Sequence, residues 1–135
     1  MTKAEAQRRN LSKAADFLAK TLAVPQSDIQ QAAAIKAFEF CFELSWKVLK
    51  ERLLEEGIEV ATPRGALRAA GDAGMIGSVE EWLGYLAARN LTSHTYNQPV
   101  ADQVYAVIGG GFVNAVQAIL LPVDAGGGAR PDPLT

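Results

Sequence analysis

The sequence predicts an all-α protein, an antiparallel up-and-down four-helix bundle with one short additional helix. Apolar side chains recur at three- to four-residue steps, no segment alternates apolar and polar residues as a strand does, and Gly and Pro separate the apolar segments. The 135 residues are 49% hydrophobic, which suffices to bury one helical core. We therefore expect one domain at residues 1–122 and a flexible tail at 123–135, which lacks core-forming residues.

The first two helices are expected at residues 3–22 and at about 28–56, separated by Pro25 and Ser27. The first has one apolar stripe, formed by Leu11, Ala14, Leu18 and Leu22. The second contains no Gly or Pro, and its apolar arc covers roughly 240°, far more than the ~100° of one bundle flank. Such a helix should contact neighbours on more than one side, and a subunit interface explains this most simply.

Capping residues predict where two shorter helices begin. Thr62 and Pro63 suit the N-cap and first position of a helix at 62–74, which ends near a glycine. Ser78 and Glu81 have the spacing of a capping box for the next helix. These signals place two helix starts between the longest helix and the polar stretch that follows.

The last helix is expected to start at Pro99 and run to Leu120. Its interior contains Gly109–Gly111, and each glycine costs about 1 kcal/mol relative to alanine in a helix. This run therefore predicts either close backbone packing or a break in the helix.

Charge and cysteine content restrict the function. Thirteen basic and fifteen acidic residues give a net charge of −2, so nucleic-acid binding would need a local basic patch. Cys41 lies in an apolar run and is expected to be a buried hydrophobe, and one cysteine with one histidine predicts no metal cluster and no cofactor. The charged N-terminus lacks a signal-peptide core, and no window holds the ~18 apolar residues of a membrane span, so we expect a cytoplasmic protein.

The stretch RNLTSHTYN at 89–97 holds the single histidine, His94, together with Arg89. Metal-independent RNA cleavage by a 2'-hydroxyl needs a proton acceptor, a proton donor and a cation for the phosphoryl oxygens. An imidazole can accept or donate a proton near neutral pH, and a guanidinium fork suits phosphate oxygens. This stretch is therefore a candidate reaction centre.

Geometry sets conditions on that interpretation. On an uninterrupted helix Arg89 and His94 would point about 140° apart, so the helix should end near Thr92 and Ser93. A chain with one histidine cannot by itself provide both an acid histidine and a base histidine, whereas a two-fold dimer brings two copies together. The alternative is a solvated helix end, in which Tyr96 is a packing aromatic with a hydrated hydroxyl.

Other charged side chains have simpler explanations. Glu39 and Glu43, with a lysine next in the row, are interpreted as a solvated helix face and not as a metal site. Arg64 and Arg68 share one face of the short helix and, with Lys36, are the candidates for contacts with RNA or nucleotide. A surface helix bearing two arginines needs no function to explain it.

Three segments carry a family resemblance. They read FEFCFELSWKVLKERLLEEG, TPRGALRAAGDAGMI and EEWLGYLAARNLTSHTYN, in this order along the chain. Together they resemble the nucleotidyltransferase substrate-binding proteins, a branch of the HEPN superfamily. The resemblance spans residues 5–121.

This resemblance implies a helical bundle that forms homodimers and is paired with a minimal nucleotidyltransferase. In many such pairs the HEPN member is an endoribonuclease toxin with the motif R-x-x-x-x-H-x-Y, which RNLTSHTY matches. The resemblance implies that Arg89 stabilises the scissile phosphate of RNA, Asn90 positions it, and His94 acts as acid or base. It also implies that Tyr96 accepts AMP from the partner, which silences the nuclease. The alternative is a non-catalytic subunit that presents a substrate to the nucleotidyltransferase.

Overall fold

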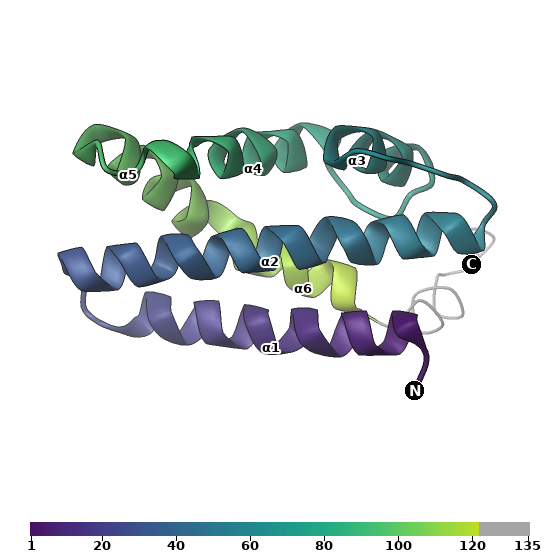
Figure 1. Ribbon diagram of the computed structural model, residues 1–135, viewed down its shortest axis with the longest axis horizontal. Helices are drawn as coiled ribbons and strands as arrows, with labels where there is room; N and C mark the ends of the chain where they lie inside the picture. Colours follow the sequence, from purple (N-terminus) through teal and green to yellow (C-terminus); the bar gives the residue numbers. More distant parts are fainter. Residues whose placement is uncertain (122–135) are drawn as a thin grey trace, which may run out of the picture.

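The computed structural model describes residues 1–121, and within this range the prediction of an all-helical protein is confirmed. Helix α2 lies between α1 on one side and the layer of α3, α4 and α5 on the other, while α6 crosses behind α2 (Figure 1). The predicted tail at 123–135 lies outside the described residues. The elements, in chain order, are α1 (Lys3–Ala23), α2 (Asp28–Glu55), α3 (Pro63–Asp72), α4 (Val79–Leu91), the 3-10 turn η1 (Thr92–His94), α5 (Gln98–Val107), the π-helical segment η2 (Ile108–Phe112) and α6 (Val113–Leu120).

The helix starts follow the predicted capping residues. The side chains of Ser27, Thr62 and Ser78 each accept a hydrogen bond from the backbone N–H three residues later, which satisfies a free donor at the N-terminus of α2, α3 and α4. Gly57, with φ of +80°, ends α2 in a conformation that favours glycine. The predicted limits of the long helix, about 28–56, agree with Asp28–Glu55.

An aromatic cluster joins α4 to α2 and η2. The ring of Phe112 lies 4.7 Å from that of Phe38 on α2 and 4.9 Å from that of Tyr85 on α4. Trp82 on α4 packs edge to face against Tyr85 and Phe112 and also contacts Phe42. These large buried rings hold the N-terminal half of α4 against α2, and so set the direction in which α4 runs toward the polar stretch.

The predicted glycine run breaks the last helix. Gly111 has φ of +107°, and the π-helical segment around it separates α5 from α6. A Cβ added at Gly109 or Gly110 would meet no neighbouring atom, so close backbone packing does not explain this run. Ile108 and Phe112 stay buried on either side, which keeps both halves in the core.

The run from Gln98 to Leu120 is long and apolar enough to cross a membrane by length and composition, with a mean hydropathy of 1.4. This corrects the expectation that no segment of the chain is apolar enough over about 18 residues to cross a bilayer. Val104, Phe112 and Val116 in this run are buried in the core, although only 28% of its apolar window is buried.

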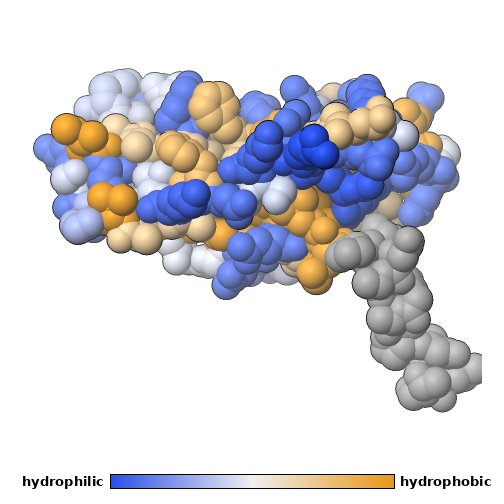
Figure 2. Space-filling view, turned by 90° about the horizontal axis from the view of Figure 1, so that it is seen from below, coloured by the Kyte–Doolittle hydropathy of each residue, from blue (hydrophilic) through white to orange (hydrophobic). Residues whose placement is uncertain are grey.

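One side of α2 remains uncovered. Phe40 is 55% exposed, and the ammonium of Lys36 lies 5.2 Å from the centre of its ring. On the α1 side of the molecule, which also has an exposed phenylalanine, Phe17, hydrophobic residues form separate groups among hydrophilic ones (Figure 2). The broad apolar arc of α2 is therefore covered only in part by the other described helices.

Candidate functional site at the end of α4

Helix α4 ends at Leu91, within the polar stretch and next to Thr92, as predicted. The Thr92 hydroxyl donates to the Arg89 carbonyl at 2.7 Å, and the chain tightens into η1. The Asn97 side chain then accepts from the Val100 N–H and caps α5. Because η1 and the following turn lie between two helices, His94 does not continue the helical direction of α4.

Arg89 reaches across to α2. Its Nη2 donates to Glu43 at 2.5 Å (Oε1) and 3.1 Å (Oε2), while Nη1 donates to the side chain of Asn90 at 3.3 Å. The guanidinium also lies 5.9 Å from the ring centre of Phe42. A planar cation held on three sides in this way has a restricted orientation, which suits a residue that receives phosphate oxygens.

The interpretation of Glu43 as part of a solvated helix face is wrong. Its carboxylate accepts hydrogen bonds from Arg89 and from the indole N–H of Trp46, and its side chain is 34% exposed. The signal in the sequence was its position beside Phe42 and Trp46, at the border of the apolar arc of α2. That position favours a partly buried carboxylate, which needs a partner.

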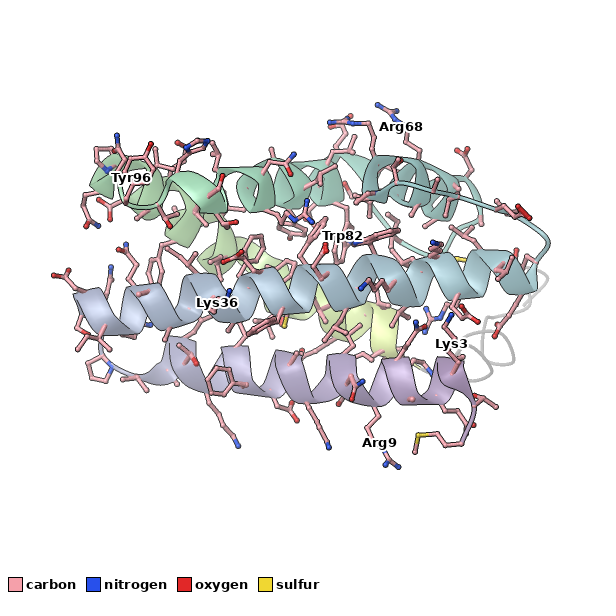
Figure 3. The ribbon with its side chains drawn as sticks, viewed as in Figure 1. Lys3, Arg9, Lys36, Arg68, Trp82 and Tyr96 are labelled. Carbon is pink, nitrogen blue, oxygen red and sulfur yellow. The ribbon has the colours of Figure 1, made fainter. Side chains whose placement is uncertain are left out.

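His94 and Tyr96 form the exposed part of the stretch. Their rings meet edge to face with 6.1 Å between centres. Tyr96 is 85% exposed and lies at the end of the molecule where η1 leads into α5 (Figure 3). Tyr96 is therefore not a core-packing aromatic, and its hydroxyl is open to another macromolecule.

The structure brings the predicted residues together in two adjoining pairs. Arg89 donates to Asn90 and to Glu43, whereas His94 contacts Tyr96. Within the described part of one chain, no hydrogen bond or ion pair joins Arg89 to His94. One protomer thus carries the guanidinium of Arg89 and the imidazole of His94 in the same stretch, with no direct hydrogen bond between them.

The three predicted RNA contacts lie in different places. Lys36 is exposed on α2, on the same half of the molecule as Tyr96 (Figure 3). Arg64 and Arg68 are exposed on α3, and Arg68 lies toward the opposite end, pointing outward. Lys36 can therefore serve the same ligand as His94, while a role for Arg64 and Arg68 stays a prediction that needs a long RNA strand.

The described residues offer no group of three His, Cys, Asp or Glu side chains placed to hold a metal ion. Cys41 is fully buried, and burial raises the pKa of its thiol to about 12. The thiol is therefore neutral at physiological pH and is neither a nucleophile nor a ligand.

Comparisons with known proteins identify the family. Residues 6–123 match the family described as nucleotidyltransferase substrate binding protein like. A Thermus thermophilus protein of known crystal structure is 32% identical with a TM-score of 0.76, and the match covers 82% of this chain and 95% of that one. A Haemophilus influenzae protein is 31% identical with a TM-score of 0.66, over 87% of this chain and 93% of that one. Its structure is described as revealing the fold of a substrate binding domain of a nucleotidyltransferase.

A curated relative from Haemophilus influenzae carries the name probable ribonuclease HepT. It is 42% identical over an alignment of 82 residues, and the match covers 57% of this chain and 56% of the relative. The match thus spans little more than half of that relative's length. On the family match, which covers nearly the whole sequence, the chain belongs to the nucleotidyltransferase substrate-binding protein family.

Proposed function

We propose that this protein is a HEPN-type, metal-independent endoribonuclease that acts as a toxin in the cytoplasm. A minimal nucleotidyltransferase partner silences it by transferring AMP to Tyr96. The observation that carries the proposal is the complete Arg89, Asn90, His94 and Tyr96 pattern on one accessible end of α4 and η1. The relative named probable ribonuclease HepT supports the nuclease activity, and the family description supports the pairing with a nucleotidyltransferase.

The nuclease acts as a homodimer. Because the chain has one histidine, two copies are needed to supply a general base and a general acid at once. Phe40, exposed on α2, is one helical turn from Glu43, which holds Arg89. An interface centred on Phe40 would bury the uncovered apolar side chain and bring two arginines and two histidines toward one groove.

The reaction needs no group beyond these side chains and RNA. The imidazole of His94 from one copy takes the proton of a ribose 2'-hydroxyl, whose oxygen attacks the adjacent phosphorus. The bond from phosphorus to the 5'-oxygen breaks, and the second copy's imidazolium gives that oxygen a proton. Arg89 stabilises the negative charge on the phosphoryl oxygens, and the products are a 2',3'-cyclic phosphate and a 5'-hydroxyl.

Modification of Tyr96 accounts for silencing. The phenolic oxygen attacks the α-phosphorus of ATP in the partner's site, pyrophosphate leaves, and the phenolic proton is lost. The 85% exposure of Tyr96 supports its access to a second enzyme. An attached anionic nucleotide two residues from His94 blocks RNA by its bulk and by charge repulsion.

Incubation of the purified protein with RNA in EDTA tests the nuclease. The wild type should cut, and His94→Ala should lose at least about 100-fold in rate, because general acid–base catalysis contributes about 10²–10⁴-fold. His94 is exposed, so this substitution should leave the fold intact. Intact RNA with the wild type, or equal cutting by His94→Ala, contradicts the proposal.

A non-catalytic subunit that presents a substrate to the nucleotidyltransferase is the second candidate, and the family description favours it. Expression without the partner separates the two. A nuclease toxin should arrest growth, with His94→Ala relieving the arrest, whereas a presenting subunit should leave growth unchanged. Co-expression with the nucleotidyltransferase and mass measurement of the peptide that contains Tyr96 tests the modification.

A further inference from the structure

A groove of about 260 Å³ opens between the N-terminal half of α2 and the start of α5. Thr95, which lies between His94 and Tyr96, forms part of its wall. The groove therefore adjoins the candidate catalytic residue and the candidate AMP acceptor. It lies on the flank of α2 that faces α5, at the edge of the interface proposed around Phe40.

Two amides that line the groove, Gln31 and Gln98, are hydrogen-bonded to each other and to the neighbouring carboxylate of Asp102. Gln31 is 7% exposed and donates to Asp102 Oδ1 at 2.9 Å. The Gln98 side chain donates to the side-chain oxygen of Gln31 at 3.0 Å and to Asp102 Oδ1 at 2.8 Å. These hydrogen bonds fix the orientation of both amides, and they hold the pKa of Asp102 below its usual value. The groove thus has preoriented acceptors and donors before any ligand arrives.

The walls of the groove are apolar on one side and acidic at the rim. Ala32, Ile35 and Ala101 line it and offer a surface for a flat ring. Asp28 and Glu39 at the groove outnumber its one cation, Lys36. Acidic side chains repel phosphate and accept hydrogen bonds from amino groups, so the groove suits a ring with amino donors and not a phosphate.

The size of the groove limits its ligand. A volume of about 260 Å³ lies below the ~300–1,000 Å³ of sites for drug-sized molecules, so one ring system fits and a whole dinucleotide does not. Single-stranded RNA is commonly read through unstacked bases that are hydrogen-bonded along their edges, and glutamine amides pair with the amino group and ring nitrogen of adenine.

We propose that this groove binds one unstacked, amino-bearing nucleobase of the RNA substrate, adenine or cytosine in preference to uracil, next to the scissile phosphate. The inference rests on the proposed nuclease function and adds a sequence preference to it. Uracil presents a carbonyl where adenine and cytosine present an amino group, and a carbonyl meets the groove carboxylates of Asp28 and Glu39 without a shared proton.

Binding to the His94→Ala protein tests the groove without cutting. Labelled hexamers of adenylate, cytidylate and uridylate are titrated and followed by fluorescence anisotropy at one salt concentration. We expect adenylate and cytidylate to bind about tenfold more tightly than uridylate, since one good bidentate base contact contributes about 1–3 kcal/mol of discrimination. Equal affinity for the three hexamers, or no binding of any, overturns the inference.

Two variants in the same background link the preference to the groove. Ala32→Leu places a larger side chain into it from an exposed helical position and should reduce the preference to less than about twofold. Gln98→Ala removes an amide that lines the groove and should act in the same direction. Ala19→Leu, at an exposed position on α1, is the matched control and should keep the full preference. A preference that persists in both groove variants overturns the inference, provided that their unfolding midpoints and oligomeric states match the control.

Two further experiments are needed. One distinguishes an RNA base from the nucleotide attached to Tyr96 as the ligand of the groove, and the other distinguishes failure of the groove proposal from failure of the nuclease proposal. If free AMP binds and Ala32→Leu weakens that binding, while the hexamers do not bind, the groove receives the nucleotide attached to Tyr96 and not an RNA base, which contradicts the inference. If the wild type cuts RNA with a preference that Ala32→Leu leaves unchanged, the groove proposal fails and the nuclease stands. If the wild type cuts nothing while the hexamer preference depends on the groove, the nuclease fails and base recognition stands.

Discussion

Glu43 on α2 accepts two hydrogen bonds from the same nitrogen of Arg89 on α4, at 2.5 and 3.1 Å. The pair joins helices through residues that lie 46 positions apart in the sequence. It orients the guanidinium and at the same time places a negative charge beside the position where a phosphate would bind. The carboxylate therefore improves positioning at the cost of affinity for RNA.

Glu43→Gln should separate these two effects. In the His94→Ala background we expect RNA to bind about fivefold more tightly, since removing a charge about 4 Å from a phosphate relieves about 1 kcal/mol of repulsion in water. The free energy of unfolding should change by less than about 1 kcal/mol, because both side chains are one-third exposed. RNA titration and urea unfolding measure the two quantities. Glu59→Gln is the control, and an affinity no higher than the control's would contradict this role of Glu43.

The glycine run gives a prediction about stability. Gly111→Ala should lower the free energy of unfolding by about 1–2 kcal/mol, because φ of +107° is unfavourable for a residue with a Cβ. Gly109→Ala should be neutral or stabilising by up to about 1 kcal/mol, because nothing lies near the added Cβ. Urea unfolding of both variants checks the difference, and equal effects would show that the backbone at Gly111 is not under this constraint.

The proposed interface predicts that one exposed phenylalanine matters and another does not. Phe40→Glu should shift the protein from dimer to monomer in sedimentation velocity, because a charge at the centre of an apolar interface is buried without a partner. Phe17→Glu on α1 is a matched control, since Phe17 is 57% exposed and Phe40 is 55% exposed. Dimers that survive Phe40→Glu but are lost in Phe17→Glu would move the interface to α1.

Cys41 predicts a loss of stability in alkali. Burial raises the pKa of its thiol to about 12 in the folded chain, from an ordinary value of 9.0. Between these values the unfolded chain loses the thiol proton while the folded chain keeps it, so this contribution is complete below pH 9 and declines as pH rises toward 12. Urea midpoints at about pH 8 and pH 10.5 should fall more in the wild type than in Cys41→Ala. Equal decreases of the urea midpoint in the wild type and in Cys41→Ala would show that folding does not raise the pKa of this thiol.

Features that depend on neighbouring residues were predictable from the sequence. Ser27 and Thr62 cap helices through bonds to residues three positions on, and Thr92 ends α4 through a bond to Arg89, so local chemistry alone locates these ends. The effect of Gly109–Gly111 was harder to predict, because a run of glycines in a helix is compatible both with close backbone packing and with a break. The positive φ of Gly111 resolves this choice.

Contacts between distant segments were not predictable. A helical wheel places Glu43 on a polar strip but cannot show that Arg89 arrives beside it. The groove requires Gln31 to meet Gln98 and Asp102, which follow it by 67 and 71 residues. These meetings depend on how α2 packs against α4 and α5, and no periodicity in one helix encodes that packing.

The chemistry of the RNA ends tests the central claim most directly. RNA cut by the wild type in EDTA should carry a 2',3'-cyclic phosphate on one fragment and a 5'-hydroxyl on the other, because the attacking oxygen comes from the ribose and not from water. Fragments ending in a 3'-hydroxyl and a 5'-phosphate, or cleavage that stops when divalent ions are removed, would contradict a mechanism in which His94 and Arg89 act without a metal.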